Sequence, residues 1–200
     1  MKRLVTVFLV CTIASFALAS ELPRISEKYT VQVTDIIDEK LAQNLIGTLL
    51  KLDQELSNDT TTQVKAILVI INSPGGEISS TLAIANTMRN LRHPVVTFAP
   101  GGAYSGAALI LSAGTKGFRY VSDTTIAMIH GVQLGGFFYG GQKEYEETLE
   151  IIKKYNQAII NFLHKTTGQT KEKLSKDLMG EKWLVGQEII SYGLADKVIP

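Results

Sequence analysis

The sequence predicts a single α/β domain in which parallel strands alternate with helices. Apolar runs typical of buried strands occupy residues 66–70 and 95–99, and stretches with helical spacing of apolar residues lie on both sides of them. Such alternation favours parallel pairing through right-handed crossovers. The chain has 200 residues, 45% of them hydrophobic, and no repeat or low-complexity linker divides it. These values suit one domain with a substantial core.

The first half of the chain begins with a helix. Residues 39–56 are amphipathic, because leucines recur at three- and four-residue steps, at Leu41, Leu45, Leu49, Leu52 and Leu56. A polar loop over residues 57–63 leads to the strand at 66–70. We expect Ser79 or Ser80 to cap the next helix, whose apolar residues again follow helical spacing.

The second half of the chain continues the alternation. The strand at residues 95–99 is followed by a helix that opens at Ser105. Strands are expected near residues 118–121 and 125–129, and a long amphipathic helix is expected over residues 142–165.

The N-terminal segment has the layout of a secretory signal peptide. Lys2 and Arg3 precede an uncharged run over residues 4–19, which ends in the small-x-small pattern Ala-Leu-Ala. We therefore predict a signal peptide at 1–19, a domain at 20–200 and a secreted or periplasmic location. The alternative is that the segment stays uncleaved as a membrane anchor.

Composition excludes several kinds of chemistry. The net charge is +1, and cleavage after residue 19 would leave 18 Lys and Arg against 19 Asp and Glu, so nothing points to nucleic acid. Cys11 lies inside the signal segment, and without it the chain has no disulfide, thiolate zinc ligand or cysteine nucleophile. No metal-binding cluster or nucleotide-binding loop is evident, so we expect neither metal nor cofactor.

The most informative segment is residues 101–111, a turn of small residues that opens into an apolar helix. Ser105 stands at the hinge and is the one hydroxyl nucleophile there. Its Oγ would lie at a helix N-terminus, where unpaired N–H groups and the helix dipole favour developing negative charge. The neighbouring glycines let a substrate carbonyl approach the backbone.

Two further motifs give this segment a context. Residues 71–76 read Ile-Asn-Ser-Pro-Gly-Gly directly after a strand, and residues 127–131 read Ala-Met-Ile-His-Gly at the end of another. With Ser105 between them, these motifs resemble those of the Clp protease proteolytic subunit family in order and spacing, and the resemblance runs from about Asp38 to the C-terminus. It implies a crotonase-like ββα superhelix with a long handle helix, a homo-oligomer built on heptameric rings, and peptide or unfolded-protein substrates.

The same resemblance implies a catalytic arrangement. Ser105 corresponds to the nucleophile and His130 to the general base, while the backbone N–H groups of Gly76 and Gly106 correspond to the oxyanion hole. The other two histidines, His93 and His164, are expected to be solvated surface residues.

The third member of the triad departs from the family. Aligned from residues 167–169 and 192–194, the family's catalytic aspartate falls on Glu181, whose side chain is one methylene longer. Asp177, one helical turn earlier, remains the alternative.

Features expected for assembly also differ. Met179 and Gly180 stand where the family has the charged pair of its ring–ring contacts. The glycine-rich aromatic segment 135–141 is either core or a wall of an interface or substrate groove. Removal of the signal peptide would leave only residues 20–29 for the family's axial loop and first helix, so we do not expect an ATP-driven unfoldase as a partner.

Three functions remain open. The leading one is an exported serine endopeptidase that acts without an unfoldase. A membrane-anchored Ser–Lys enzyme similar to signal peptide peptidases would need a lysine such as Lys116 near the serine. The third is a non-catalytic scaffold, with a triad disabled by the change to Glu181.

Overall fold

The computed structural model describes residues 22–134 and 140–200. The predicted signal peptide and residues 135–139 of the glycine-rich aromatic segment lie outside the described residues, so both predictions stay untested. The strands are β1 (Thr30–Val33), β2 (Ile67–Ile71), β3 (Val95–Ala99), β4 (Gly102–Tyr104), β5 (Arg119–Ser122), β6 (Ile126–Ile129), β7 (Lys182–Val185) and β8 (Lys197–Ile199). The helices are the 3₁₀ helix η1 (Glu27–Tyr29), α1 (Glu39–Asn58), α2 (Ile78–Asn90), α3 (Gly106–Ser112), α4 (Gln142–Thr167), α5 (Lys171–Asp177) and α6 (Gln187–Tyr192).

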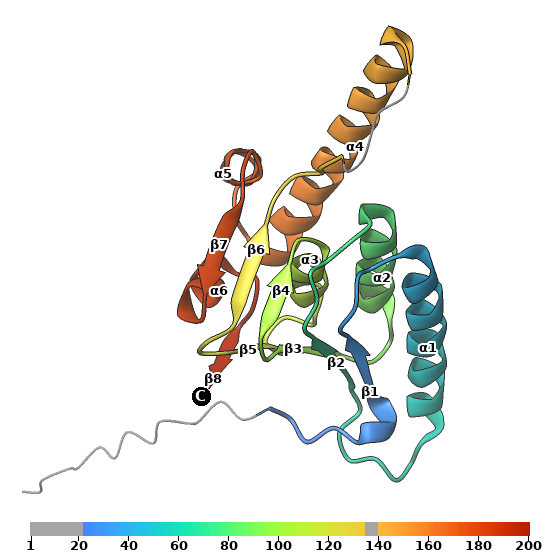
Figure 1. Ribbon diagram of the computed structural model, residues 1–200. Coiled ribbons are helices and arrows are strands. Elements are labelled where there is room, and N and C mark those ends of the chain that lie inside the picture. Colours follow the sequence, from blue (N-terminus) through green and yellow to red (C-terminus); the bar gives the residue numbers. More distant parts are fainter. Residues whose placement is uncertain (1–21, 135–139) are drawn as a thin grey trace, which may run out of the picture.

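The strands form two sheets, seen beside the helices in Figure 1. The larger sheet has the order β1-β2-β3-β5-β8, and each of its neighbouring pairs is parallel, as predicted. The smaller has the order β4-β6-β7, and β7 runs antiparallel to β6. β7, which was not predicted from the sequence, is the strand that departs from parallel pairing. The chain leaves β6 for α4 and α5 and returns at the same end of the strand, where Lys182 pairs with Ile129.

Successive strands step from one sheet to the other. A short turn carries β3 of the larger sheet into β4 of the smaller, and the β5–β6 turn repeats the step. Isolated bridges between Ile37 and Gly76 and between Ser73 and Ala103 mark the same step for the earlier strands. The repeated strand–strand–helix units confirm the predicted ββα superhelix.

The N-terminus of α1 agrees with the prediction from local sequence, and the N-terminus of α2 does not. α1 begins as predicted, with Asp38 Oδ1 accepting a 2.7 Å hydrogen bond from Leu41 N. The N-cap position of α2 is occupied by Glu77 and not by Ser79 or Ser80, and the Glu77 side chain makes no capping hydrogen bond. Both serine hydroxyls instead donate to the Glu77 carboxylate, at 2.7 and 2.8 Å, so these serines lie inside the first turn.

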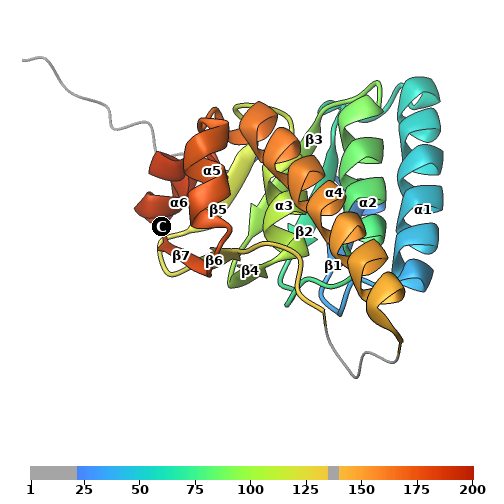
Figure 2. The ribbon, with the colours of Figure 1, turned by 90° about the horizontal axis from the view of Figure 1, so that it is seen from above.

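The long helix α4 projects well beyond the body of the molecule (Figure 1), and in the view from above it runs diagonally across the molecule (Figure 2). Its residues that are fully buried, Ile159, Phe162 and Leu163, all belong to its C-terminal half. That half anchors the helix on the core, and the predicted handle is confirmed. Within residues 22–134 and 140–200, no helix is both long and apolar enough to cross a membrane.

Candidate active site

The turn between β4 and α3 holds Ser105 in a strained conformation. Its backbone has φ 55° and ψ −119°, and it is the one non-glycine residue with positive φ in the part of the chain that the structure describes. Ser105 N donates a 2.7 Å hydrogen bond to Met128 O, which ties the turn to β6. The hydroxyl makes no capping bond to α3. Strain of this kind persists where the surrounding structure enforces it, commonly at functional sites.

Two backbone N–H groups beside Ser105 are free to bind an anion. Over residues 22–134 and 140–200, no hydrogen bond is recorded from the N–H of Gly76 or of Gly106. Gly106 N is the first amide of α3, where a helix has no internal acceptor. Gly76 has φ 157°, and a Cβ there would overlap Ile37 O and lie 2.7 Å from Ile37 N, so only glycine fits.

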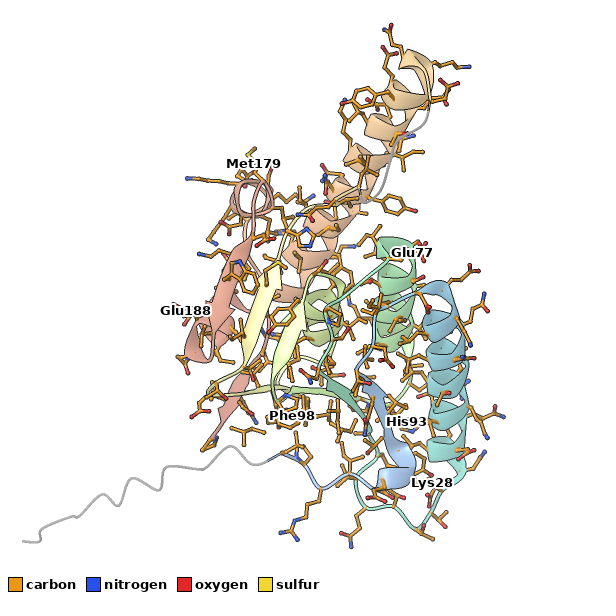
Figure 3. The ribbon with its side chains drawn as sticks, in the orientation of Figure 1. Lys28, Glu77, His93, Phe98, Met179 and Glu188 are labelled. Atoms are coloured by element: carbon orange, nitrogen blue, oxygen red, sulfur yellow. The ribbon has the colours of Figure 1, made fainter. Side chains whose placement is uncertain are left out.

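A cavity of about 240 Å³ joins these groups. It is lined by Gly76, Glu77, Ile78, Ser105, Gly106, Leu109, His130, Gly131, Val132, Gln133 and Ile159. Figure 3 labels Glu77, one of the lining residues, at the end of α2. Hydrogen bonds from Ser79 and Ser80 hold the pKa of the Glu77 carboxyl below its usual range. The rest of the wall is largely apolar.

His130 follows β6 and is half-buried in this cavity. Its Nδ1 is hydrogen-bonded to the carbonyl oxygen of Gly131. A carbonyl only accepts, so Nδ1 carries the hydrogen, and in the neutral ring Nε2 is then the nitrogen that can accept a proton. The structure therefore places four of the predicted site residues around one cavity: Ser105, His130, Gly76 and Gly106.

Glu181 is not among the residues that line the cavity. It is exposed, and its Oε2 accepts a 3.1 Å hydrogen bond from Trp183 Nε1. The β6–β7 ladder pairs Ile129 with Lys182 and ends there. Continued by one step, the same register would bring Glu181 opposite His130. Its assignment as the triad acid stays a prediction.

Asp177 is held elsewhere. Its Oδ2 accepts hydrogen bonds of 2.7 Å from Lys173 Nζ and 2.7 Å from Tyr192 OH. Partial burial acts to raise the pKa of Asp177, but these two hydrogen bonds outweigh it and lower the pKa. Burial and the Asp177 contact together raise the pKa of the Tyr192 hydroxyl. These bonds give Asp177 a structural role between α5 and α6.

The remaining histidines lie away from the site. His164 is exposed, as predicted, and its Nδ1 contacts Gln169 O. His93 is not a solvated surface residue, contrary to the prediction. Its side chain is 17% exposed and its Nδ1 lies 2.9 Å from Asp53 Oδ1, because the loop before β3 packs against α1. Asp53 also accepts from the backbone N of both Arg92 and His93.

Lys116, the lysine considered for a Ser–Lys dyad, lines a different cavity of about 340 Å³. Its Nζ is 3.3 Å from Asp196 Oδ1. The same carboxylate accepts from Arg119 Nε at 2.8 Å and from Nη2 at 2.6 Å. Sequence reasoning missed this buried pair, because 77 residues separate its members and no local pattern marks it.

The fold and this cavity define a serine-hydrolase-like site on a ββα superhelix. A family model described as Clp protease matches residues 17–200. The chain is 39% identical over 176 residues to the ATP-dependent Clp protease proteolytic subunit 2 of Chlamydia trachomatis serovar D, covering 88% of this chain and 83% of that protein. The chain therefore belongs to the Clp protease family, whose members are serine peptidases, and the predicted resemblance is confirmed.

Proposed function

We propose that this protein is a serine endopeptidase that hydrolyses peptides or unfolded protein segments with Ser105 as nucleophile. The observation that carries the proposal is the convergence, around one cavity, of a strained serine, a histidine and two backbone N–H groups without acceptors. These are the parts that acyl transfer requires. Membership of the Clp protease family supports the same reaction.

The reaction proceeds through an acyl-enzyme. His130 Nε2 takes the Ser105 proton as Oγ attacks the peptide carbonyl carbon, and the N–H groups of Gly76 and Gly106 bind the resulting oxyanion. Collapse of the tetrahedral intermediate breaks the C–N bond, and the imidazolium returns its proton to the leaving amine. Water, activated by the same imidazole, then attacks the ester and releases Ser105.

Glu181 is proposed to complete the triad. The Gly131 carbonyl fixes the tautomer of His130, but a neutral carbonyl stabilises an imidazolium less than a carboxylate does. The strand register favours Glu181 for that role, since it would stand opposite His130, whereas Lys173 and Tyr192 hold Asp177 away. For this role, the Glu181 carboxylate would have to give up its hydrogen bond from Trp183 and accept one from His130.

Export without an ATP-driven unfoldase is also proposed. It rests on the sequence of residues 1–19, with two cations, an uncharged run and a small-x-small end. The relative named above is described as ATP-dependent, and an exported enzyme would lack access to cytoplasmic ATP. Its substrates would then be peptides or protein segments that are already extended, because no unfoldase would unfold a protein before cleavage.

A homo-oligomer is proposed as the working form, a heptameric ring by resemblance. Large apolar side chains are exposed on several elements of the single chain, including Ile36, Leu50, Ile151, Trp183 and Val185. The projecting half of α4 contributes Ile151, which is 53% exposed. Contiguous exposed apolar surface is typical of sites that meet a partner, and these side chains are proposed to belong to such surfaces.

The test is to label the purified protein with a fluorophosphonate and to measure cleavage of a fluorogenic peptide, alongside Ser105→Ala. We expect labelling and hydrolysis in the wild type and neither in the variant, with unchanged melting temperature. A wild type that is folded but neither labels nor cleaves would favour the scaffold alternative. Cleavage retained by Ser105→Ala would reject the assignment of the nucleophile.

A further inference from the structure

A buried threonine beside the active site has no hydrogen-bond partner. Thr81 lies in α2 and is fully buried. Its Oγ1 is the one buried side-chain nitrogen or oxygen without a partner among residues 22–134 and 140–200. A buried hydroxyl that loses water without gaining a partner costs free energy. The hydroxyl therefore does not stabilise the fold by hydrogen bonding. The role of Thr81 lies in the atoms that its side chain contacts.

Thr81 packs on the Cα of Gly106. A Cβ at position 106 would overlap Thr81 Oγ1 and would lie 3.2 Å from Cγ2 and 3.3 Å from Cβ of the same residue. The space between α2 and the start of α3 is thus only as wide as a glycine. The Thr81 side chain fills that space completely.

This contact bears on the geometry of the oxyanion hole. One proposed donor, Gly76, lies two residues before the start of α2, and the other, Gly106, is the first residue of α3. Both N–H groups must reach the same oxygen, at about 2.7–3.1 Å. Their separation is set by how closely α2 approaches α3, and Thr81 is the residue of α2 that meets Gly106.

A second contact holds Gly106 from the other side. A Cβ on Gly75 would lie 2.7 Å from Gly106 N and 2.9 Å from Ser105 Cβ. The start of α3 is therefore clamped between the glycine turn and Thr81. If the contact from the Thr81 side chain were removed, both the Gly106 N–H and the Ser105 Oγ would be free to shift.

We infer that Thr81 is a positioning residue whose side chain sets the distance between the two oxyanion donors, an inference that rests on the proposed peptidase function. The effect comes from the shape of the side chain, since its hydroxyl makes no hydrogen bond. Thr81 does not touch substrate, because it is fully buried and does not line the cavity. The same contact explains why position 106 must be glycine.

The first experiment compares substitutions at Thr81. In Thr81→Ala, kcat should fall about tenfold while KM changes by less than about twofold, because a displaced donor weakens the transition state more than substrate binding. Labelling by the fluorophosphonate should slow in parallel. Thr81→Val, which restores the shape without the unpaired hydroxyl, should rescue kcat and raise the melting temperature. Thr87→Ala, on the same helix with its hydroxyl bonded to Ala83 O, is the matched control and should keep wild-type kcat.

The second experiment is a double substitution. Gly106→Ala should be nearly inactive, because its Cβ would overlap the Thr81 side chain. The double variant with Thr81→Ala should have a kcat at least about tenfold higher than Gly106→Ala alone, because the clash is relieved while the N–H at position 106 remains. Wild-type kcat in Thr81→Ala would overturn the inference, even where Gly106→Ala alone does not fold. Where Gly106→Ala does fold, a kcat of the double variant equal to the product of the two single losses would overturn it as well. Ser105→Ala separates the two hypotheses. If it is inactive while Thr81→Ala is normal, only the inference fails, and if it is active the proposed function fails first.

Discussion

The strain at Ser105 and the hydrogen bond at His130 are the residue-scale features that prepare this site. A positive φ in a non-glycine residue is unfavourable, and here the bond from Ser105 N to Met128 O and the packing of Gly75 maintain it. The conformation leaves the Ser105 hydroxyl without a capping role. The Gly131 carbonyl fixes the His130 tautomer. In the proposed mechanism, these contacts orient both residues before substrate binds.

His130→Ala should lower kcat at least about 10³-fold, because the members of a catalytic triad act as a unit. The matched control is His164→Ala, which removes an exposed imidazole at the end of α4 and should leave kcat within about twofold of wild type. Steady-state hydrolysis of a peptide at neutral pH measures both. Equal activity of the two variants would remove His130 from the mechanism.

Glu181→Gln should lower kcat by roughly 10²- to 10⁴-fold, because the imidazolium of the transition state loses its counter-charge. Asp177→Asn is the comparison and should cost less than about tenfold, since Asp177 bonds Lys173 and Tyr192. Glu181→Asp tests adaptation: activity falls if the backbone suits the longer side chain and rises if the residue has merely drifted. An inactive Asp177→Asn beside an active Glu181→Gln would show that the alignment of this segment is wrong.

At the scale of elements, one ion pair joins the ends of several segments behind the site. Arg119 of β5 is 1% exposed, and its Nη1 donates to Thr166 O of α4 at 2.9 Å and to Ser112 O of α3 at 3.3 Å. Asp196, just before β8, accepts from Arg119 and from Gly117 N. Burial acts to raise the pKa of Asp196, but the hydrogen bonds from Arg119 outweigh it and lower the pKa to about 2. The pair therefore anchors one end of α3, and the proposed nucleophile Ser105 lies at its other end.

Asp196→Asn should lower the free energy of unfolding by about 3 kcal/mol at pH 7, because it leaves a buried guanidinium without its carboxylate. The folded pKa of Asp196 lies below the ordinary 3.8, so its stabilising effect is present above about pH 4 and is lost as pH falls towards 2. The difference between wild type and variant should shrink over that interval. Urea denaturation at pH 7, 4 and 3 measures it, and a difference independent of pH would contradict the ion-pair explanation.

At the scale of the whole molecule, the main feature is the set of large apolar side chains that a single chain leaves exposed to solvent. Trp183 is 51% exposed, and its ring packs against Tyr104, the residue before Ser105, with centroids 5.8 Å apart and planes tilted by 57°. Met179, also labelled in Figure 3, is 85% exposed in the turn before β7. That turn carries Glu181, so a partner docking there would be able to change its contact with Trp183. The proposed assembly and the proposed completion of the triad by Glu181 would in this way be linked by position.

Light scattering on the eluting protein should give a mass several times that of one chain. Ile151→Glu should reduce it, because it places a charge in the apolar surface proposed to meet a partner on α4. Gln157→Glu adds the same charge to an exposed polar position of the same helix and should leave the mass unchanged. A wild type that elutes as a monomer at every concentration would reject the proposed oligomer.

The sequence by itself determined the local features of this protein. Helical leucine spacing predicted α1, and apolar runs predicted β2 and β3. Three short motifs predicted the site residues Ser105, His130, Gly76 and Gly106, which line one cavity. Each of these predictions depends on residues close together in the chain. Only the tertiary structure decided the antiparallel β7, the pairing of His93 with Asp53, the Arg119–Asp196 anchor and the contact of Thr81 with Gly106. Each of these joins segments that are distant in sequence, and its energy comes from packing or charge pairing that exists only once the sheets and helices have met.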